Sequence, residues 1–454
     1  MDARIPIAVF AATVAACLPP AEAHAADIER HVAIISVDGL GARELTESPT
    51  CIREHSMLRQ LMRRGAYASS VMSVLPTLTY PAHATLVTGV PPAVHGIVDN
   101  TNGAGSWYLD RAAIAATTLW DAAHDAGLRV AIVTWPSTYG AKVDYLIPEN
   151  LHAAADSQDL LALASTPGLF AQLAAATGQP RLLPFFDREA GEPLDHMTGT
   201  FAAEVVRRYR PNLLFAHFLD YDHRQHFDGP NSPAACAALD RIDQWLRQLV
   251  NAYRLSGLLE RTTFIVVSDH GFLPVRLMIN FAALLDAAGW QQVSGGLPLG
   301  EVYDINVSGG SVAFTAKAAI GNKRGDTLAA ALHERVLAAH GDLVRWMSPE
   351  EASRAGGFPG ASFVLCARAG FWFVALPHTG SVLLDPGVFR GQHGYCPEEP
   401  MMDAVFIVSG QGVRPAGNIG PMHMEDVAPT IAALMRLPLP AATGHDVSAN
   451  FARP

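Results

Sequence analysis

The sequence HVAIISVDGL occupies residues 31–40, and its first seven residues form a nearly continuous apolar run rich in β-branched side chains. Such a run predicts a strand that is buried on both faces, as strands of parallel sheets are. Four later segments have the same character: RVAIVTW (129–135), NLLFAHF (212–218), TTFIVVS (262–268) and AVFIVSG (404–410).

Helical patterns lie between these predicted strands, over 52–64, 117–126, 198–209 and 232–254. Strands that alternate with helices favour a mostly parallel sheet covered on both faces. We therefore expect an α/β fold, a three-layer α/β/α sandwich, in a main domain over residues 27–454.

The alternation breaks between about 275 and 390. This segment has Gly-Gly pairs at 295–296 and 309–310, a helical pattern near 326–340 and a pattern that predicts a hairpin around 362–376. We interpret it as a smaller capping lobe inserted into the main domain.

The first 25 residues have the features of an export signal. Asp2 and Arg4 precede the apolar run IPIAVFAATVAAC, and two A-x-A sites follow at 21–23 and 23–25. We expect cleavage and a periplasmic or extracellular mature chain, without a transmembrane helix. Two alternatives stay open: a lipid anchor on Cys17, which ends the lipobox-like VAAC, and a buried N-terminal helix.

Charge and cysteine content narrow the class of protein further. The chain has 454 residues, a net charge of −11 and only three lysines, with no Lys/Arg run, so a duplex nucleic acid partner is not expected. Four cysteines follow the predicted signal and form no C-x-x-C motif: Cys51, Cys236, Cys366 and Cys396. One or two disulfides could form, in any of three full pairings, and the oligomeric state is not predicted.

Aspartates and histidines follow the predicted strands. Asp38 ends the first strand, Asp222 and His226 lie four residues apart after the third, Asp269-His270 follows the fourth, and His393 lies in GQHGY. Each could instead belong to a turn or a helix face. Because sites of open α/β sheets gather at the carboxyl ends of the strands, their joint occurrence predicts a catalytic zinc site with oxygen and nitrogen ligands.

The segment PTLTYPAHATLVTG (76–89) contains a candidate nucleophile, Thr79. Pro81 is compatible with the first turn of a helix, so Thr79 is expected at a helix N-terminus, where a phosphate is favoured. The structural alternative is a hydroxyl that only caps the helix. A threonine hydroxyl attacks only if a base or a metal removes its proton, and two zinc ions could do this.

These motifs resemble the alkaline phosphatase superfamily, and within it the nucleotide pyrophosphatase/phosphodiesterase (type I phosphodiesterase) family. The resemblance covers most of 31–445 and includes SVDGL, PTLTYPAHATLVTGVPPAVHGIVDN, D-x-x-x-H-x-x-GP at 222–230, VVSDHGF and GQHGY. It implies an alkaline-phosphatase-like fold, two Zn²⁺ ions per chain and a small phosphate ester as substrate.

The resemblance also implies roles for individual residues. One zinc would be held by Asp222, His226 and His393, the other by Asp38, Asp269 and His270, with Thr79 between them. Thr79 would form a covalent phospho-threonine, and Asn100 would bind a phosphoryl oxygen. Tyr80 stands where the family often has Phe and could stack on a flat group, while His217 stands where nucleotide-hydrolysing members usually have Tyr.

Phosphodiester hydrolysis is the favoured activity. A monoester carries a second negative charge, which a nearby cation would have to neutralise. Arg224 is the candidate in the motifs, but an arginine in such a loop is more often solvated or paired with a carboxylate than bound to a substrate. A phosphonate hydrolase would need a pair of lysines, and Lys142 stands alone; a sulfatase would need Cys or Ser at position 79. A non-catalytic exported binding protein is a further alternative, although every predicted catalytic and metal-binding residue is present.

Overall fold

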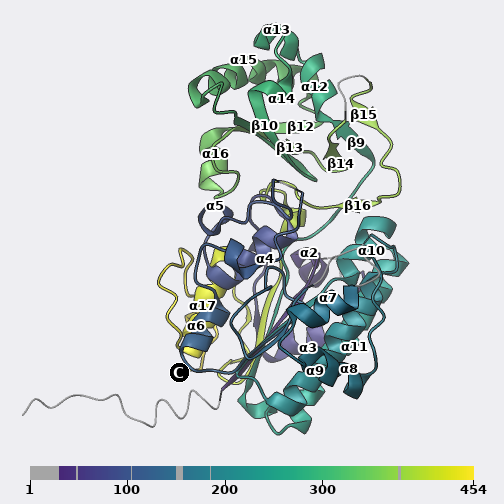
Figure 1. The fold of residues 1–454 in the computed structure, drawn as a ribbon, viewed down its shortest axis with the longest axis vertical. Coiled ribbons are helices and arrows are strands. Elements are labelled where there is room, and N and C mark those ends of the chain that lie inside the picture. The colour runs from purple at the N-terminus through teal and green to yellow at the C-terminus, as the bar shows by residue number, and fades with distance from the viewer. Residues whose placement is uncertain are drawn as a thin grey trace, which may run out of the picture.

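A computed structural model describes residues 30–47, 50–103, 105–149, 157–184, 186–376 and 380–453. Its largest sheet has eight strands in the order β18-β2-β17-β7-β1-β6-β4-β5 (Figure 1). Only β17 runs against the others. The strands are β1 (His31–Val37), β2 (Ala66–Tyr67), β4 (Val130–Val133), β5 (Tyr145–Ile147), β6 (Leu213–Phe218), β7 (Thr262–Val267), β17 (Phe406–Gly410) and β18 (Gly417–Asn418).

The five strands predicted from apolar runs are all present, and they form the centre of this sheet. β1 has the predicted bounds, and all seven of its residues are buried. β4 is shorter than predicted, because Thr134 has a φ of 58° and leaves the extended conformation. The mostly parallel sheet is therefore confirmed.

Helices cover both faces of the sheet, which confirms the three-layer α/β/α architecture (Figure 1). Alternate side chains of β1 enter the two cores: Val32 and Ile34 pack in one, Ala33 and Ile35 in the other. The first core is closed by α4 (Thr79–Thr88), α6 (Leu119–Asp125) and α17 (Val427–Met435). The second is closed by α3 (Met57–Arg64), α7 (Ser157–Ala164), α8 (Leu169–Thr177), α9 (Gly191–Tyr209), α10 (Asp220–Asp228) and α11 (Pro233–Leu255).

Capping residues set several helix ends that the apolar pattern alone placed differently. α3 begins at Met57 rather than at 52, because the Ser56 hydroxyl accepts a hydrogen bond from the N–H of Arg59. The predicted helices over 117–126 and 232–254 correspond to α6 and α11. The pattern over 198–209 is the C-terminal part of α9, which begins at Gly191.

A second sheet, antiparallel and with its own core, lies beyond α4 and α5 (Pro92–His95) in Figure 1. Its strand order is β10 (Tyr303–Ser308), β11 (Ser311–Ala316), β13 (Ala361–Ala367) and β12 (Val344–Met347). The helices around it are α12 (Phe281–Ala287), α13 (Trp290–Ser294), α14 (Leu299–Val302), α15 (Asn322–His340) and α16 (Pro349–Arg354). The assignment of 275–390 as a capping lobe stays a prediction.

The prediction of a hairpin over 362–376 is wrong. β13 pairs with β11 and β12, whereas β14 (Phe371–Val374) pairs in parallel with β9 (Leu277–Asn280). A turn at Gly370, whose φ is 93°, directs the chain out of this second sheet, and the Gly370 carbonyl accepts hydrogen bonds from the N–H groups of Arg276 and Leu277. β14 thus pairs with β9, a strand almost a hundred residues earlier in the chain, and local sequence does not reveal so distant a partner.

Short strand pairs complete the connections: β15 (Leu383–Leu384) joins β9, β16 (Gly391–Gln392) joins β8 (Leu273–Pro274), and β19 (Met422–His423) joins β3 (Val71–Met72). Two disulfides resolve the pairing that the sequence left open, Cys51–Cys236 and Cys366–Cys396. No helix of the described residues is long and apolar enough to cross a bilayer. The predicted signal over 1–25, with Cys17, lies outside the described residues.

Candidate functional site

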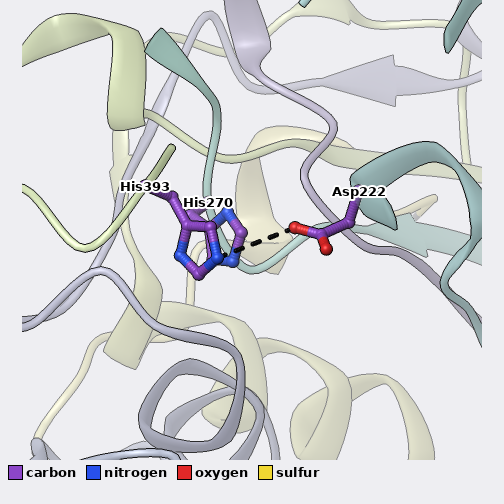
Figure 2. A group of neighbouring side chains, drawn as sticks. All are labelled: Asp222, His270 and His393. Atoms are coloured by element: carbon purple, nitrogen blue, oxygen red, sulfur yellow. Dashed lines mark ion pairs between the residues drawn. The ribbon is translucent and has the colours of Figure 1, made fainter. Parts of the chain in front are cut away.

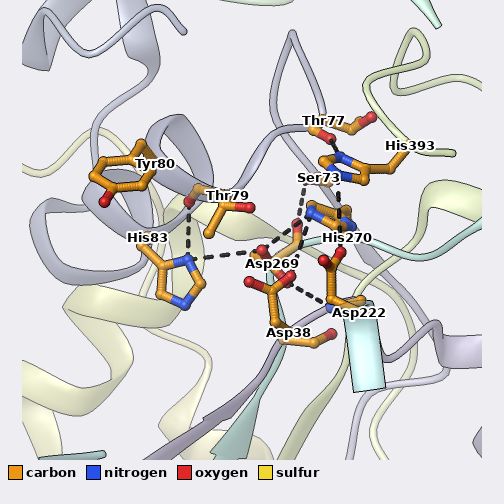
Figure 3. A network of polar contacts seen from close by, with 12 residues as sticks. Asp38, Ser73, Thr77, Thr79, Tyr80, His83, Asp222, Asp269, His270 and His393 are labelled. Carbon is orange, nitrogen blue, oxygen red and sulfur yellow. Dashed lines mark hydrogen bonds and ion pairs between the residues drawn. The ribbon is translucent and has the colours of Figure 1, made fainter. Parts of the chain in front are cut away.

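Three aspartates meet at one edge of the large sheet because three parallel strands end there. Asp38 follows β1 directly, Asp269 lies two residues after β7, and Asp222 lies in the first turn of α10, which follows β6. The register pairs Ser36 of β1 with His217 of β6 and with Val267 of β7, so the strands end at the same level. Figure 3 shows the three carboxylates close to one another.

The aspartates form two groups with histidines, each compact enough to hold one metal ion. One group is Asp38, Asp269 and His270; the other is Asp222, His270 and His393; within each, one ligand atom per residue lies within 4.8 Å of the others. His270 Nε2 is 3.1 Å from Asp269 Oδ2, and His393 Nε2 is 3.8 Å from Asp222 Oδ1 (Figure 2).

The ligand set that the resemblance implies for His226 stays a prediction. His226 is not a member of either compact group, and His270 takes part in both. His226 nevertheless lies beside the second group, with Nε2 3.5 Å from Asp222 Oδ2 and its ring centroid 5.0 Å from that of His393. All six predicted metal-binding Asp and His residues are thus at one site.

The backbone fixes the orientation of the three histidine rings. Nδ1 of each lies against a carbonyl oxygen: that of Gly271 at 3.1 Å for His270, Thr77 at 3.0 Å for His393, and Gly391 at 3.3 Å for His226. A ring whose Nδ1–H donates to a carbonyl has its lone pair on Nε2. Burial lowers the pKa of each ring, to about 3 for His226, so all three rings are neutral at pH 7.

Several buried polar atoms of the site have no hydrogen-bond partner among the described residues. They are both carboxylate oxygens of Asp38, Oδ1 of Asp222, Oδ2 of Asp269 and Nε2 of His270. Burial raises the pKa of Asp38, and the neighbouring Asp269 and Asp222 raise it further. Unpaired buried carboxylates are costly, and divalent cations would compensate them. A donor set of oxygen and imidazole nitrogen without thiolate fits a catalytic zinc site.

Thr79 lies where the sequence predicts, at the first residue of α4 and at the wall of the pocket. The N-cap of this helix is Leu78 and no side chain caps it, so the capping role that was the structural alternative for Thr79 is excluded. The Thr79 carbonyl accepts a hydrogen bond from His83 Nδ1 at 2.8 Å, and the same nitrogen is 3.7 Å from Asp269 Oδ2. His83 thereby ties the start of α4 to the carboxylates (Figure 3).

Asn100 and Tyr80 are adjacent at the pocket. The Tyr80 N–H donates to Asn100 Oδ1 at 3.0 Å, which fixes the orientation of this amide and leaves its NH₂ group to donate elsewhere. The ring of Tyr80 is 1% exposed and packs against Trp107, and its hydroxyl donates to Glu149 Oε2 at 2.6 Å. Little of this ring is open to a ligand, so the structure does not favour the stacking role considered for Tyr80.

Sequence reasoning missed Glu149, a buried carboxylate two residues after β5. Burial raises its pKa to about 8. Its Oε1 lies 3.6 Å from Nε2 of His217, which is itself 3.4 Å from Asp38 Oδ2. The usable signal was its position after a strand of the same sheet, but β5 has only three residues and was not predicted.

A pocket of about 320 Å³ contains Thr79, Asn100, Asp222, His226 and His393. No Lys or Arg lines it among the described residues. Arg224 is engaged elsewhere, because Nη1 and Nη2 donate to Glu189 at 3.0 and 2.5 Å. A larger cavity, of about 770 Å³, lies at the opposite edge of the sheet and contains none of the predicted site residues.

Several known proteins resemble the chain in sequence. An uncharacterized pyrophosphatase/phosphodiesterase of Schizosaccharomyces pombe is 21% identical over 90% of this chain and 77% of its own length. Human ectonucleotide pyrophosphatase/phosphodiesterase family member 5 is 26% identical over 54% of this chain, and rat family member 1 is 22% identical over 47%. The matches span only 45% and 21% of these two longer relatives.

Solved structures show the same fold. Murine ectonucleotide pyrophosphatase/phosphodiesterase 5, an inactive variant in complex with AMP, superposes with a TM-score of 0.62 at 20% identity, over 93% of this chain and all of that one. The human protein of the same name gives 0.61 with the same coverage. The alkaline-phosphatase-like fold is thereby confirmed. The family model described as type I phosphodiesterase / nucleotide pyrophosphatase matches residues 32–395, and the chain therefore belongs to that family.

Proposed function

We propose that the protein is a two-zinc phosphoesterase that hydrolyses phosphodiester bonds through a covalent phospho-threonine. The observation that carries this proposal is that Thr79 lines one pocket with Asp222, His226 and His393, beside two compact groups of metal-capable side chains that share His270. Asp38, Asp269 and His270 would hold one ion, and Asp222, His226 and His393 the other, with Thr79 between them. When bound, the ions would neutralise phosphate oxygens and lower the pKa of the Thr79 hydroxyl.

In the first step the Thr79 oxygen forms a bond to phosphorus and the bond from phosphorus to one ester oxygen breaks. The hydroxyl proton of Thr79 is lost, and the departing alcohol gains one. In the second step water attacks the phospho-threonine, which releases a phosphate monoester and restores the Thr79 hydroxyl. The Asn100 NH₂ group donates to a phosphoryl oxygen, and the positive end of the dipole of α4, at Thr79, favours the negative charge.

The charge of the pocket supports a diester rather than a monoester. No lysine or arginine lines it among the described residues, and Arg224 is paired with Glu189. The second negative charge of a monoester would find no side-chain cation there. A diester, with a single charge at the scissile phosphate, suits the pocket better.

Two further proposals concern the location of the protein and the role of the segment 275–390. The disulfides Cys51–Cys236 and Cys366–Cys396 suit an oxidising compartment, which supports export to the periplasm or the extracellular space. The segment 275–390 contributes Ser308, Trp372 and Phe389 to the pocket wall, which supports its role as a cap over the site.

The test compares two aryl esters. The purified protein should hydrolyse bis(p-nitrophenyl) phosphate with a higher kcat/KM than p-nitrophenyl phosphate, and a chelator should abolish both rates until zinc is restored. A reversed preference would contradict the diesterase assignment. No turnover of either ester by zinc-loaded protein would favour the non-catalytic alternative.

A further inference from the structure

Three aromatic side chains from separate segments form one wall of the pocket that contains Thr79. Phe227 lies near the end of α10, Trp372 in β14, and Phe389 between β15 and β16. The rings of Phe227 and Phe389 are stacked, with centroids 5.7 Å apart and planes at 29°, and Trp372 meets Phe389 edge-on at 5.6 Å. We call these three residues the aromatic wall.

The aromatic wall lies beside the metal-capable group of Asp222, His270 and His393. The ring centroid of Phe389 is 6.0 Å from that of His226, which neighbours Asp222. The start of α4 is tied through His83 to Asp269, in the other metal-capable group. Figure 3 shows Thr79 near Asp38 and Asp269, with Asp222 and His393 farther along.

In an in-line displacement the attacking and leaving oxygens are on opposite faces of phosphorus. A phosphate attacked by Thr79 would therefore release its leaving group toward the His226 side. We propose that the aromatic wall binds the leaving group of the diester and selects substrates whose leaving group is flat, uncharged and aromatic. This inference rests on the proposed function.

The chemistry of the wall supports an uncharged aromatic group. Aromatic rings favour offset-stacked and edge-to-face contacts with other flat rings. Arg188 lies 6.0 Å from the Phe227 centroid and pairs with Asp228, while Arg390, which follows Phe389, donates to the backbone carbonyls of Gly387 and Phe389. Neither Lys nor Arg lines the pocket within the described part of the chain, so a charged leaving group would find no side-chain cation there.

The test uses methyl p-nitrophenyl phosphate, in which only the leaving group is aromatic. Phe389→Leu and Trp372→Leu should each lower kcat/KM for this ester by roughly tenfold. Phe371→Leu is the matched control, because Phe371 lies on the same strand as Trp372 but packs into the core of the second sheet and does not line the pocket. It should leave kcat/KM within about twofold.

A binding measurement separates this inference from the proposed function. In a Thr79→Ala background, calorimetry should show that Phe389→Leu weakens binding of the same ester by roughly tenfold and that Phe371→Leu does not. Unchanged binding and unchanged kcat/KM in folded Phe389→Leu and Trp372→Leu proteins would overturn the inference. If the protein binds the ester in the predicted way but never hydrolyses it, the proposed function fails while the aromatic wall stands.

Discussion

The imidazole rings of His270 and His393 are stacked, with centroids 3.8 Å apart and planes within 10° of parallel. The two residues come from segments more than a hundred residues apart, and each directs Nδ1 at a backbone carbonyl. Both rings must be neutral to stack so closely, and burial lowers the pKa of each. Their Nε2 atoms are thus fixed as lone-pair donors on the side of Asp222 (Figure 2).

Metal binding should be stoichiometric and should stabilise the fold. We expect two zinc ions per chain by elemental analysis and a higher melting temperature with zinc than after chelation, because the cations would compensate buried, unpartnered carboxylates. His393→Ala should reduce the zinc content to about one ion. Two ions retained by His393→Ala, or a melting temperature unaffected by zinc, would argue against the assigned ligands.

Thr79→Ala should abolish diester hydrolysis, with a fall in kcat of about 10³-fold or more, because no other nucleophile replaces its oxygen. Thr79→Ser retains a hydroxyl and should keep measurable activity. Steady-state rates of zinc-loaded variants with matched melting temperatures provide the test. Near-wild-type activity of Thr79→Ala would show that water attacks the ester directly.

The hydrogen bond between Tyr80 and Glu149 should contribute to stability. Tyr80→Phe removes a buried donor and leaves Glu149 Oε2 unsatisfied, which should lower the free energy of unfolding by about 1–3 kcal/mol. Tyr253→Phe is the matched control, since the Tyr253 hydroxyl is equally buried but has no partner among the described residues. Urea denaturation measures both changes, and an equal loss in the two variants would contradict this account.

Glu44 should make stability depend on pH. Burial raises the pKa of Glu44 from its ordinary 4.5 to about 7, opposed by a hydrogen bond with Asn231. Burial thus makes Glu44 contribute to the stability of the folded state as long as it is protonated there. This contribution is fully present below pH 4.5 and is lost as the pH rises through 7. The loss amounts to ~3 kcal/mol at pH 8.

Glu44→Gln cannot ionise and should escape this loss. The free energy of unfolding of Glu44→Gln relative to that of the wild type should therefore increase between pH 5 and pH 8. Urea denaturation at the two pH values measures the difference. A difference that is the same at both values would show that Glu44 is not responsible.

Local sequence predicts the centre of this fold well but not its edges. The run HVAIISV defines β1 because a strand buried on both faces needs apolar side chains at every position. The three-residue β5 has too few residues for a pattern, so Glu149 was missed with it. The parallel pairing of β14 with β9 depends on a distant partner, which explains the wrong hairpin.

The residues of the candidate site also differ in whether local sequence predicts them. Asp38 and Asp269 were predictable because each follows a recognisable strand. The aromatic wall was not, because Phe227, Trp372 and Phe389 come together only through the pairing of distant segments. The contacts of His217 with Asp38 and Glu149 likewise depend on tertiary structure alone.

The stereochemistry at phosphorus tests the central claim, attack by Thr79, most directly. A P-chiral methyl p-nitrophenyl phosphorothioate would be hydrolysed in ¹⁸O-labelled water and the configuration of the product determined by ³¹P NMR. Two successive in-line displacements, the first by Thr79 and the second by water, predict net retention. Net inversion would contradict the account, because it requires a single direct attack by water.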